Sequence, residues 1–369
     1  MKNKNLHVDK FFLTIVGILV LVGFFIFLSA SLGLLAREGT IFSRVAGKQL
    51  FYGIFLGLPA LFIASRVSYD KWKKLALPLF AFSLLLLLLT FVPHIGVTTK
   101  GASRWISIFG LSFQPVELVK VGIVLYLSLW YSNIKGKIKD MRYGMGSLLC
   151  IICIPAVLLA FQPDNGSVIL LIATSVSIYL VASGRWKHLL IVALLLLVTI
   201  SIVASTRPYV QSRIKTFLDP SLDPQGAGYQ MRQATIAIGS GEIIGRGFGQ
   251  SVQKFNYLPE PVSDSIFAVF AEEFGFVGSV MLIFLFVAFT LRGLWLGARA
   301  PDTFGSLVTV GLTIMISSQS FLNIGAMLGL VPLSGLPLIF VSQGGTALVF
   351  ALFSVGIILG ISRHRVTLP

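Results

Sequence analysis

The sequence predicts an all-α polytopic membrane protein. Of its 369 residues, 56% are hydrophobic and only 12% are charged, and its mean hydropathy is far above that of a soluble domain. Several apolar runs are long enough to cross about 30 Å of hydrocarbon as helices. We therefore expect one integral membrane domain, residues 1–369, with ten spans at residues 11–36, 49–65, 75–93, 115–132, 144–162, 166–183, 188–206, 264–291, 304–328 and 339–361.

The basic residues predict how these spans are oriented. An even number of spans puts both termini on one side, and most of the Lys and Arg residues in short connections fall on that side. The positive-inside rule makes it the cytoplasmic side, so both termini are expected in the cytoplasm. The net charge of +15 then mostly faces anionic lipid, and nothing in it calls for nucleic acid. The long connection of about residues 206–263 is expected outside.

The first outer connection leads into a charged helix start. Arg104 precedes Trp105 and a short amphipathic piece, and Pro115 suits the first turn of the fourth span. Glu117 and Lys120 follow three residues apart, so they share a helix face and can pair. The pair either anchors the helix end at the interface or lines a polar cavity.

Two further connections carry polar groups. In the turn between spans five and six, Asp164 lies at the outer mouth, although Asp164 or Ser167 can simply cap span six. Residues 219–250 of the long connection are rich in glycine. Their backbone N–H groups could approach a phosphate, but flexible turns around a short helix are the commoner use of such a sequence.

Three carboxylates follow on the eighth span, which begins after Pro259 and Pro261. Ser263 or Asp264 is available to cap its first N–H groups, which places Asp264 near the outer rim. Glu272 and Glu273 fall about 12 Å further along the same helix. Acidic residues inside an apolar helix are costly, so they indicate a functional or paired environment.

The start of the tenth span is polar. Ser342, Gln343 and Thr346 surround Gly344 and Gly345 after a segment broken by prolines and glycine. Such residues commonly serve close helix packing in membranes, and hydroxyls that face a cavity are the alternative.

Five stretches, taken together and in order, resemble the SEDS family of peptidoglycan polymerases, and the division-type FtsW members somewhat more than the elongation-type RodA members. The stretches are GASRWISIFGLSFQPVELVK, QPDNGS, GYQMRQATIAIGSG, YLPEPVSDSIFAVFAEEFGFVG and NIGAMLGLVPLSGLPLIFVSQGG. Two features depart from the family pattern. The family's usual Ser-Tyr-Gly-Gly-Ser reads here as Ser342, Gln343, Gly344, Gly345 and Thr346, and the bulky apolar residue often found after the aspartate is Ser265.

The resemblance implies a glycosyltransferase that polymerises lipid II into glycan strands at the outer face of the bacterial cytoplasmic membrane, during cell division or elongation. It implies Asp264 as the catalytic base. The substrate-binding residues that it implies are Glu117, Lys120, Arg104, Asp164 and Ser342. The implied partners are a class B penicillin-binding protein and other membrane proteins of the division or elongation machinery. A divalent cation, Mg²⁺ or Mn²⁺, is a candidate cofactor with Asp264 or Asp164 as oxygen ligands, and the sequence names no metal site.

Two other classes of function remain open. A lipid II flippase or transporter would line its path with the same carboxylates and lysine, although such proteins often break their helices near the middle of the membrane. A non-catalytic scaffold of the cell-wall synthesis complex would recruit a partner enzyme and would not turn over lipid II.

Overall fold

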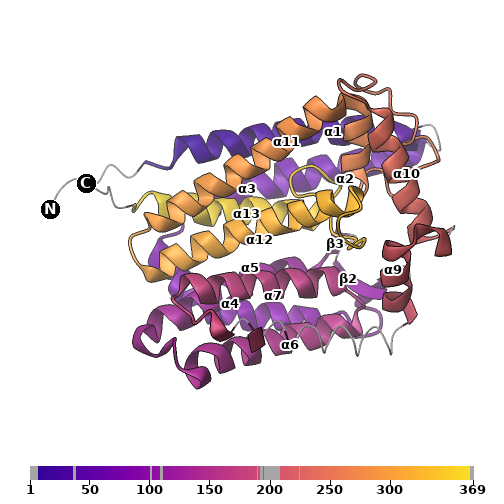
Figure 1. Ribbon diagram of the computed structural model, residues 1–369. Helices are drawn as coiled ribbons and strands as arrows, with labels where there is room; N and C mark the ends of the chain where they lie inside the picture. Colours follow the sequence, from indigo (N-terminus) through magenta and orange to yellow (C-terminus); the bar gives the residue numbers. More distant parts are fainter. Residues whose placement is uncertain are drawn as a thin grey trace.

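The computed structural model describes residues 7–35, 39–99, 102–108, 111–188, 190–191, 194, 208–223 and 225–365. Long helices run side by side along one axis (Figure 1). The helices are α1 (Lys10–Leu35), α2 (Gly39–Leu50), the π-helix η1 (Phe51–Gly57), α3 (Leu58–Arg66), α4 (Tyr69–Leu89), α5 (Pro115–Asn133), the 3-10 helix η2 (Lys135–Lys137), the π-helix η3 (Met141–Gly146), α6 (Ser147–Phe161), α7 (Asn165–Val181), α9 (Pro208–Leu218), the 3-10 helix η4 (Pro220–Leu222), α10 (Ala227–Ser240), α11 (Ile266–Ala298), α12 (Thr303–Met327) and α13 (Gly345–Ser362).

The helical membrane fold is confirmed. Eight helices in the described ranges are long and apolar enough to cross a membrane, and the shorter apolar helix α7 lies where the sixth span is expected. The eight run over Lys10–Leu34, Phe42–Arg66, Tyr69–Leu89, Pro115–Asn133, Met141–Phe161, Ile266–Ala298, Thr303–Met327 and Gly345–Ser362. Most of the seventh predicted span, 188–206, lies outside the described residues, so a total of ten remains a prediction.

The helices α5, α12 and α13 form the centre of the bundle, and most of their side chains are buried. A small residue permits the closest approach. A Cβ atom on Gly311 of α12 would lie 2.7 Å from Val124 of α5 and 2.8 Å from Ile178 of α7. Glycine at this position therefore lets α12 pack directly against both neighbours, as small residues commonly do in membrane helix packing.

The first outer connection is a small sheet, not the expected amphipathic piece. Strands β1 (Gly96–Thr99), β2 (Ala102–Ile108) and β3 (Leu111–Phe113) form an antiparallel sheet in the order β1-β2-β3. β-Branched and aromatic residues such as Val97, Thr98, Trp105 and Ile106 favour strands here. The sheet ends at α5 and thereby places the start of that helix.

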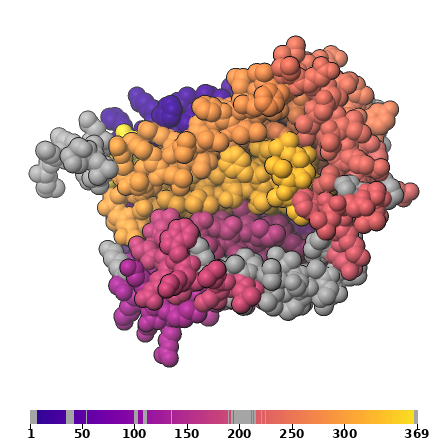
Figure 2. All heavy atoms as spheres, viewed as in Figure 1, coloured from indigo at the N-terminus to yellow at the C-terminus, as the bar shows by residue number. Residues whose placement is uncertain are grey.

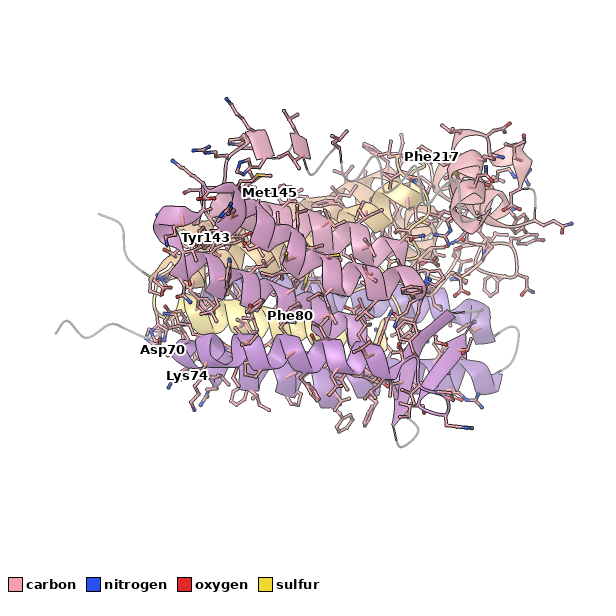
Figure 3. All side chains as sticks on the ribbon, turned by 90° about the horizontal axis from the view of Figure 1, so that it is seen from below. Asp70, Lys74, Phe80, Tyr143, Met145 and Phe217 are labelled. Carbon is pink, nitrogen blue, oxygen red and sulfur yellow. The ribbon has the colours of Figure 1, made fainter. Side chains whose placement is uncertain are left out.

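The two ends of the bundle differ. Asp70, Lys74 and Tyr143 lie at one end, and Phe217 of α9 lies at the opposite end (Figure 3). The segment from α9 to the start of α11 covers that opposite end, where it forms the coral surface in Figure 2. The long connection between spans seven and eight is therefore folded against the bundle as α9, η4, α10 and a series of turns.

Helix α11 is kinked at Gly275, so it is not the single continuous helix that the sequence suggested. Gly275 has φ 63° and ψ −161°. The connection after α10 compensates the break, because Phe276 N donates to Glu242 O (2.9 Å) and Val277 N donates to Ile243 O (3.0 Å). Backbone groups that the kink removes from the helix ladder are thus paired with the loop, as buried backbone groups must be.

The first and last described segments meet at the end of the bundle that carries Asp70. The Asp9 carboxylate accepts hydrogen bonds from Arg292 of α11 at 2.7 and 3.1 Å and from Arg365 after α13. Burial alone would raise the pKa of Asp9, but the hydrogen bonds from Arg292, Phe12 N and Arg365 hold this pKa below its ordinary value. The three segments are therefore joined by one ionic contact.

We predict that Asp9→Asn lowers the melting temperature at pH 7, by an amount that corresponds to about 2 kcal/mol for hydrogen bonds to a charged group. The folded-state pKa is depressed, so the carboxylate stabilises above its unfolded pKa, and this stability is lost as pH falls through the lowered value. Melting curves across pH check this, and the difference from the parent should close in acid. Asp70→Asn, whose side chain is 79% exposed, is the control and should change little.

We also predict that Gly275→Ala destabilises the protein by roughly 1–3 kcal/mol, because a side chain at this φ and ψ is strained. The added Cβ would in addition lie 2.4 Å from Gly245 N. Thermal unfolding measures the effect. Gly239→Ala in α10 is the matched control, since a Cβ there meets nothing within 4 Å. Equal stability of the two variants would contradict the role of the kink.

Candidate functional site

Glu117 and Lys120 form the predicted pair. Pro115 stands in the first turn of α5, and Glu117 follows in the same turn. Lys120 Nζ donates to Glu117 Oε1 at 2.8 Å, and the two residues are only 1% and 5% exposed. The pair is therefore buried, and it is not an ion pair that snorkels at the interface.

A third group completes this contact. Lys120 Nζ also donates to Gln319 Oε1 of α12 at 2.9 Å. Glu117, Lys120 and Gln319 line a small cavity together with apolar residues of α12 and α13. Two of the three ammonium N–H groups of Lys120 are thus hydrogen-bonded, and the third has no hydrogen-bond partner among the described residues.

Asp264 lies in the turn before α11. Ser265 occupies the N-cap position of that helix and makes no capping hydrogen bond with its side chain, so the expected cap by Ser263 or Asp264 is wrong. The hydroxyl of Ser265 instead accepts from Gln230 Nε2 of α10 at 2.9 Å. The backbone carbonyl of Asp264 accepts from Asn323 Nδ2 of α12 at 2.8 Å. Tertiary contacts, and not a helix cap, therefore hold this turn.

The segment between α12 and α13 packs on the same turn. Gln343 N donates to Val262 O at 2.8 Å, two residues before Asp264. The hydroxyl of Ser342 accepts from Leu338 N at 2.8 Å, which closes a local turn. Ser342 is buried, and its O–H hydrogen remains available for donation.

Arg104 and Asp164 both make hydrogen bonds at the turn before α7. Arg104 of β2 donates from Nε to Gln162 O at 3.0 Å and from a terminal nitrogen to Pro163 O. Asp164 caps α7, because its carboxylate accepts from Ser167 N at 3.3 Å and from the Ser167 hydroxyl at 2.9 Å. The capping interpretation of Asp164 is thus confirmed, and Arg104 braces the turn that contains it.

The carboxylates of Glu272 and Glu273 bind residues 251–254 of the connection that precedes α11. Glu272 accepts from the Ser251 hydroxyl and from the backbone N–H groups of Val252 and Gln253 at 2.5 to 3.2 Å. Glu273 accepts from Lys254 Nζ at 2.6 Å, and Lys254 also donates to Ser29 of α1.

The glycines of this connection serve the same packing. Arg246 N and Gly247 N donate to the carbonyls of Glu272 and Glu273 at 3.0 and 2.9 Å. A Cβ on Gly245 would lie 2.1 Å from Glu273 O. These two N–H groups therefore donate to carbonyls of α11 and do not form a phosphate-binding loop.

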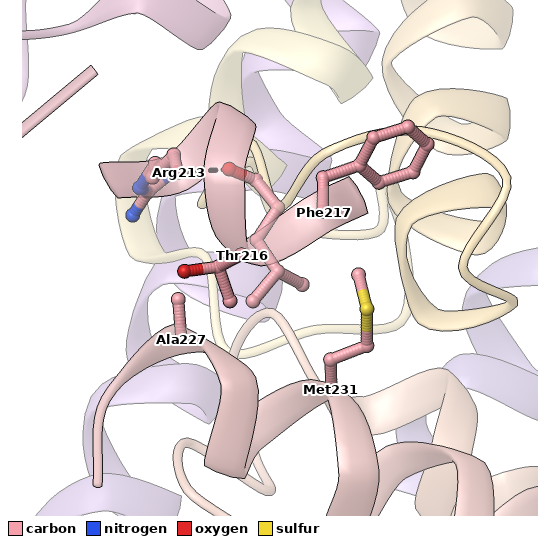
Figure 4. Close-up of a pocket in the computed structure, with 6 residues that line it drawn as sticks. Arg213, Thr216, Phe217, Ala227 and Met231 are labelled. Carbon is pink, nitrogen blue, oxygen red and sulfur yellow. Dashed lines mark hydrogen bonds between the residues drawn. The ribbon is translucent and has the colours of Figure 1, made fainter. Parts of the chain in front are cut away.

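A second small cavity lies between α9 and α10. Arg213, Thr216 and Phe217 of α9 face Ala227 and Met231 of α10 across it (Figure 4). Arg213 also donates to the carbonyl of Leu333, which lines the cavity as well. The contact joins α9 to the segment between α12 and α13.

Sequence reasoning missed Gln319 and Asn323. Both are buried, at 2% and 1% exposure, in the C-terminal half of the apolar helix α12. The signal was present, because a carboxamide in a membrane span is costly unless it is hydrogen-bonded. Their partners, Lys120 and the Asp264 carbonyl, are distant in sequence and become visible only in the fold.

The fold and these contacts define a polytopic membrane protein with a buried polar site at the end of the bundle where the sheet lies. The family model of FtsW/RodA/SpoVE cell cycle proteins matches residues 9–367. The chain therefore belongs to this family, which confirms the SEDS resemblance.

Curated relatives and solved structures agree with this membership. A "Probable peptidoglycan glycosyltransferase FtsW" of Geobacter sp. (strain M18) is 35% identical, over 96% of this chain and 97% of the relative. The stage V sporulation protein E of Bacillus subtilis (strain 168) is 36% identical over 85% and 86%.

Among solved structures, a chain of a peptidoglycan synthase complex is similar with a TM-score of 0.80. The two chains are 29% identical, and the match covers 97% of this chain and 98% of that one. The rod shape determining protein RodA of Thermus thermophilus is similar with a TM-score of 0.71 at 27% identity, over 98% of each chain.

Proposed function

We propose that this protein is a peptidoglycan glycosyltransferase that polymerises lipid II into glycan strands, with Asp264 as the catalytic base. The observation that carries the proposal is the buried Glu117–Lys120–Gln319 contact beside a cavity, linked through α12 to the turn of Asp264. It occurs in a chain whose curated relatives are named peptidoglycan glycosyltransferases.

Glycosyl transfer requires a general base for the acceptor hydroxyl and a cation near the leaving pyrophosphate. Asp264 takes the proton of the acceptor sugar hydroxyl while the oxygen bonds to the anomeric carbon of the donor and the bond to the lipid pyrophosphate breaks. The pyrophosphate leaves as an anion. The Lys120 ammonium is a preorganised cation that stabilises this charge through its third N–H group. Glu117 orients Lys120, and Ser342 contributes a hydroxyl donor near the start of α13.

We assign Arg104 and Asp164 an indirect role in substrate binding. Arg104 and Asp164 support the site through the turn before α7, where their side-chain groups are already hydrogen-bonded. Within the described residues there is no group of three His, Cys, Asp or Glu that would hold a metal alone. A Mg²⁺ or Mn²⁺ ion at Asp264 would therefore take its other oxygen ligands from the substrate's pyrophosphate. The ion would neutralise the charge of that pyrophosphate.

The partner that we propose is a class B penicillin-binding protein, with other membrane proteins of the division or elongation machinery. The similarity to a chain of a peptidoglycan synthase complex supports a complex of this kind. Depletion of the protein in the source bacterium distinguishes the two roles, because loss of a division enzyme blocks septation and loss of an elongation enzyme changes cell shape.

We further propose that the protein lies in the cytoplasmic membrane with both termini in the cytoplasm and residues 206–263 outside. The asymmetry of Lys and Arg supports this orientation. Single-cysteine labelling is the measurement. An impermeant reagent added outside should label a cysteine in the α9–α10 connection, and labelling at residues 135–142 instead would overturn the orientation.

We predict that Asp264→Asn keeps expression and melting temperature but lowers glycan synthesis at least about a hundredfold, the scale usual for loss of a general base. The substitution retains size and polarity, and the Asp264 backbone carbonyl can still accept from Asn323. Purified protein with and without a matching class B penicillin-binding protein is incubated with lipid II, and polymer is measured.

The same assay separates the other functions. A parent protein that makes no polymer under either condition would support the scaffold hypothesis. Transport of lipid II by that protein would instead favour the flippase. An Asp264→Asn variant that polymerises at the parent rate would remove Asp264 from the base role. Partial rescue of the variant by raised Mg²⁺ or Mn²⁺ would assign the carboxylate to a metal.

We predict that Glu117→Gln and Lys120→Met each abolish polymerisation while the protein still inserts. Breaking a buried pair also costs about 3–5 kcal/mol, because one charge is left uncompensated. The double variant should therefore melt higher than the sum of the single effects implies, while it stays inactive. Melting curves and the lipid II assay check both parts, and normal activity of either single variant would reduce the pair to a helix anchor.

A further inference from the structure

Two carboxamides on α12 connect the two halves of the proposed site. Gln319 and Asn323 are four residues apart, so they lie on the same face of the helix, about 6 Å apart along its axis. Both side chains are almost fully buried. Each one reaches a different part of the site and also the same short segment of backbone.

Gln319 holds the lysine. Its Oε1 accepts from Lys120 Nζ at 2.9 Å, and its Nε2 donates to Pro337 O at 3.2 Å. The acceptor and the donor of one amide are thus both used, and the ammonium is fixed between Glu117 and Gln319.

Asn323 holds the turn of the aspartate. Its Nδ2 donates to Asp264 O and to Leu336 O, both at 2.8 Å. The orientation of this amide is determined by its partners, because two carbonyl oxygens can only face the nitrogen. Its Oδ1 accepts no hydrogen bond from the described residues. Asn323 therefore contributes two N–H donors, and burying its acceptor oxygen without a hydrogen bond is energetically unfavourable.

The two amides share one backbone anchor. Leu336 and Pro337 are consecutive, and each gives its carbonyl to one of the amides. One turn of a buried helix thus fixes the spacing between Lys120 and the Asp264 turn.

We propose that Gln319 and Asn323 are positioning residues that set the register between Lys120 and Asp264. The inference rests on the proposed function, because it gives those two groups their roles in the reaction. Neither amide acts on the substrate, and each acts through the group that it holds.

The alternative is that the amides only join helices, as polar side chains commonly do in membranes. Two features distinguish the positioning role. Both amides contact the groups of the proposed chemistry, and the transfer depends on the distance between the base and the cation. A displacement of about 1 Å at a reacting group costs on the order of a hundredfold in rate.

The experiment compares Asn323→Leu with Ser320→Ala in the parent background. Ser320 is a matched control, because it is fully buried on the same helix and its hydroxyl donates only to Ile316 O of that helix. Initial rates of polymerisation are measured against lipid II concentration in the presence of the partner protein. Hydrogen exchange of the backbone at residues 262–265 and 336–338 is measured on the same samples.

We expect Asn323→Leu to lower kcat about a hundredfold with KM within about twofold, because the lost contact does not touch substrate. Exchange at both segments should rise. Ser320→Ala should match the parent in each measurement. Should Asn323→Leu fail to fold, Asn323→Ser, which can donate to only one of the two carbonyls, takes its place with a smaller fall in kcat.

Gln319 is tested by a pair of variants. Gln319→Glu keeps an acceptor for Lys120 and loses the donor to Pro337, whereas Gln319→Met loses both. We expect Gln319→Glu to retain more activity than Gln319→Met. The double variant Gln319→Met with Asn323→Leu should lose less than the product of the two single losses, because either change already breaks the shared register.

Parent-like kcat in Asn323→Leu, or an equal loss in Ser320→Ala, would overturn the inference. A parent protein that makes no polymer would instead defeat the proposed function. In that case hydrogen exchange alone tests whether Asn323 holds the Asp264 turn. Unchanged exchange at residues 262–265 in Asn323→Leu refutes this role, and raised exchange supports it.

Discussion

The cost of burying charge in an apolar bundle governs the end of this protein that carries the proposed site. Lys120 and Lys254 are both almost completely buried, and each has a carboxylate within 2.8 Å. An unpaired ammonium in such surroundings would be neutralised or would destabilise the fold. At this end the Lys254–Glu273 pair joins the preceding connection to α11, and Gln319 of α12 adds a hydrogen bond to the Glu117–Lys120 pair of α5.

The two lysines serve different purposes. Lys254 pairs with Glu273 and binds Ser29, so it fastens the connection before α11 to α1. Lys120 pairs with Glu117 of its own helix, donates to Gln319 of α12 and borders a cavity. A lysine that borders a cavity is suited to bind an anion, whereas a lysine that joins two elements is suited to hold them together.

The kink of α11 and the segment between α12 and α13 place Asp264. Carboxylates of Glu272 and Glu273 bind the preceding connection, and the backbone freed at Gly275 pairs with that same connection. Asp264 then lies in a turn held by Asn323 and by Gln343 N, and not in a helix cap. The position of the proposed base is thus an outcome of packing between three segments that are far apart in sequence.

The sequence alone determined the class of fold, the approximate spans and the residues that carry charge into them, because apolar length and buried charge are local signals. It also placed Glu117 and Lys120 on one helix face, since their separation is three residues. It could not determine the sheet before α5, the kink at Gly275 or the uncapped start of α11 after Ser265, where tertiary packing outweighs local preference. Nor could it assign partners to Gln319 and Asn323, because their hydrogen bonds join α12 to segments that only the folded bundle brings within reach.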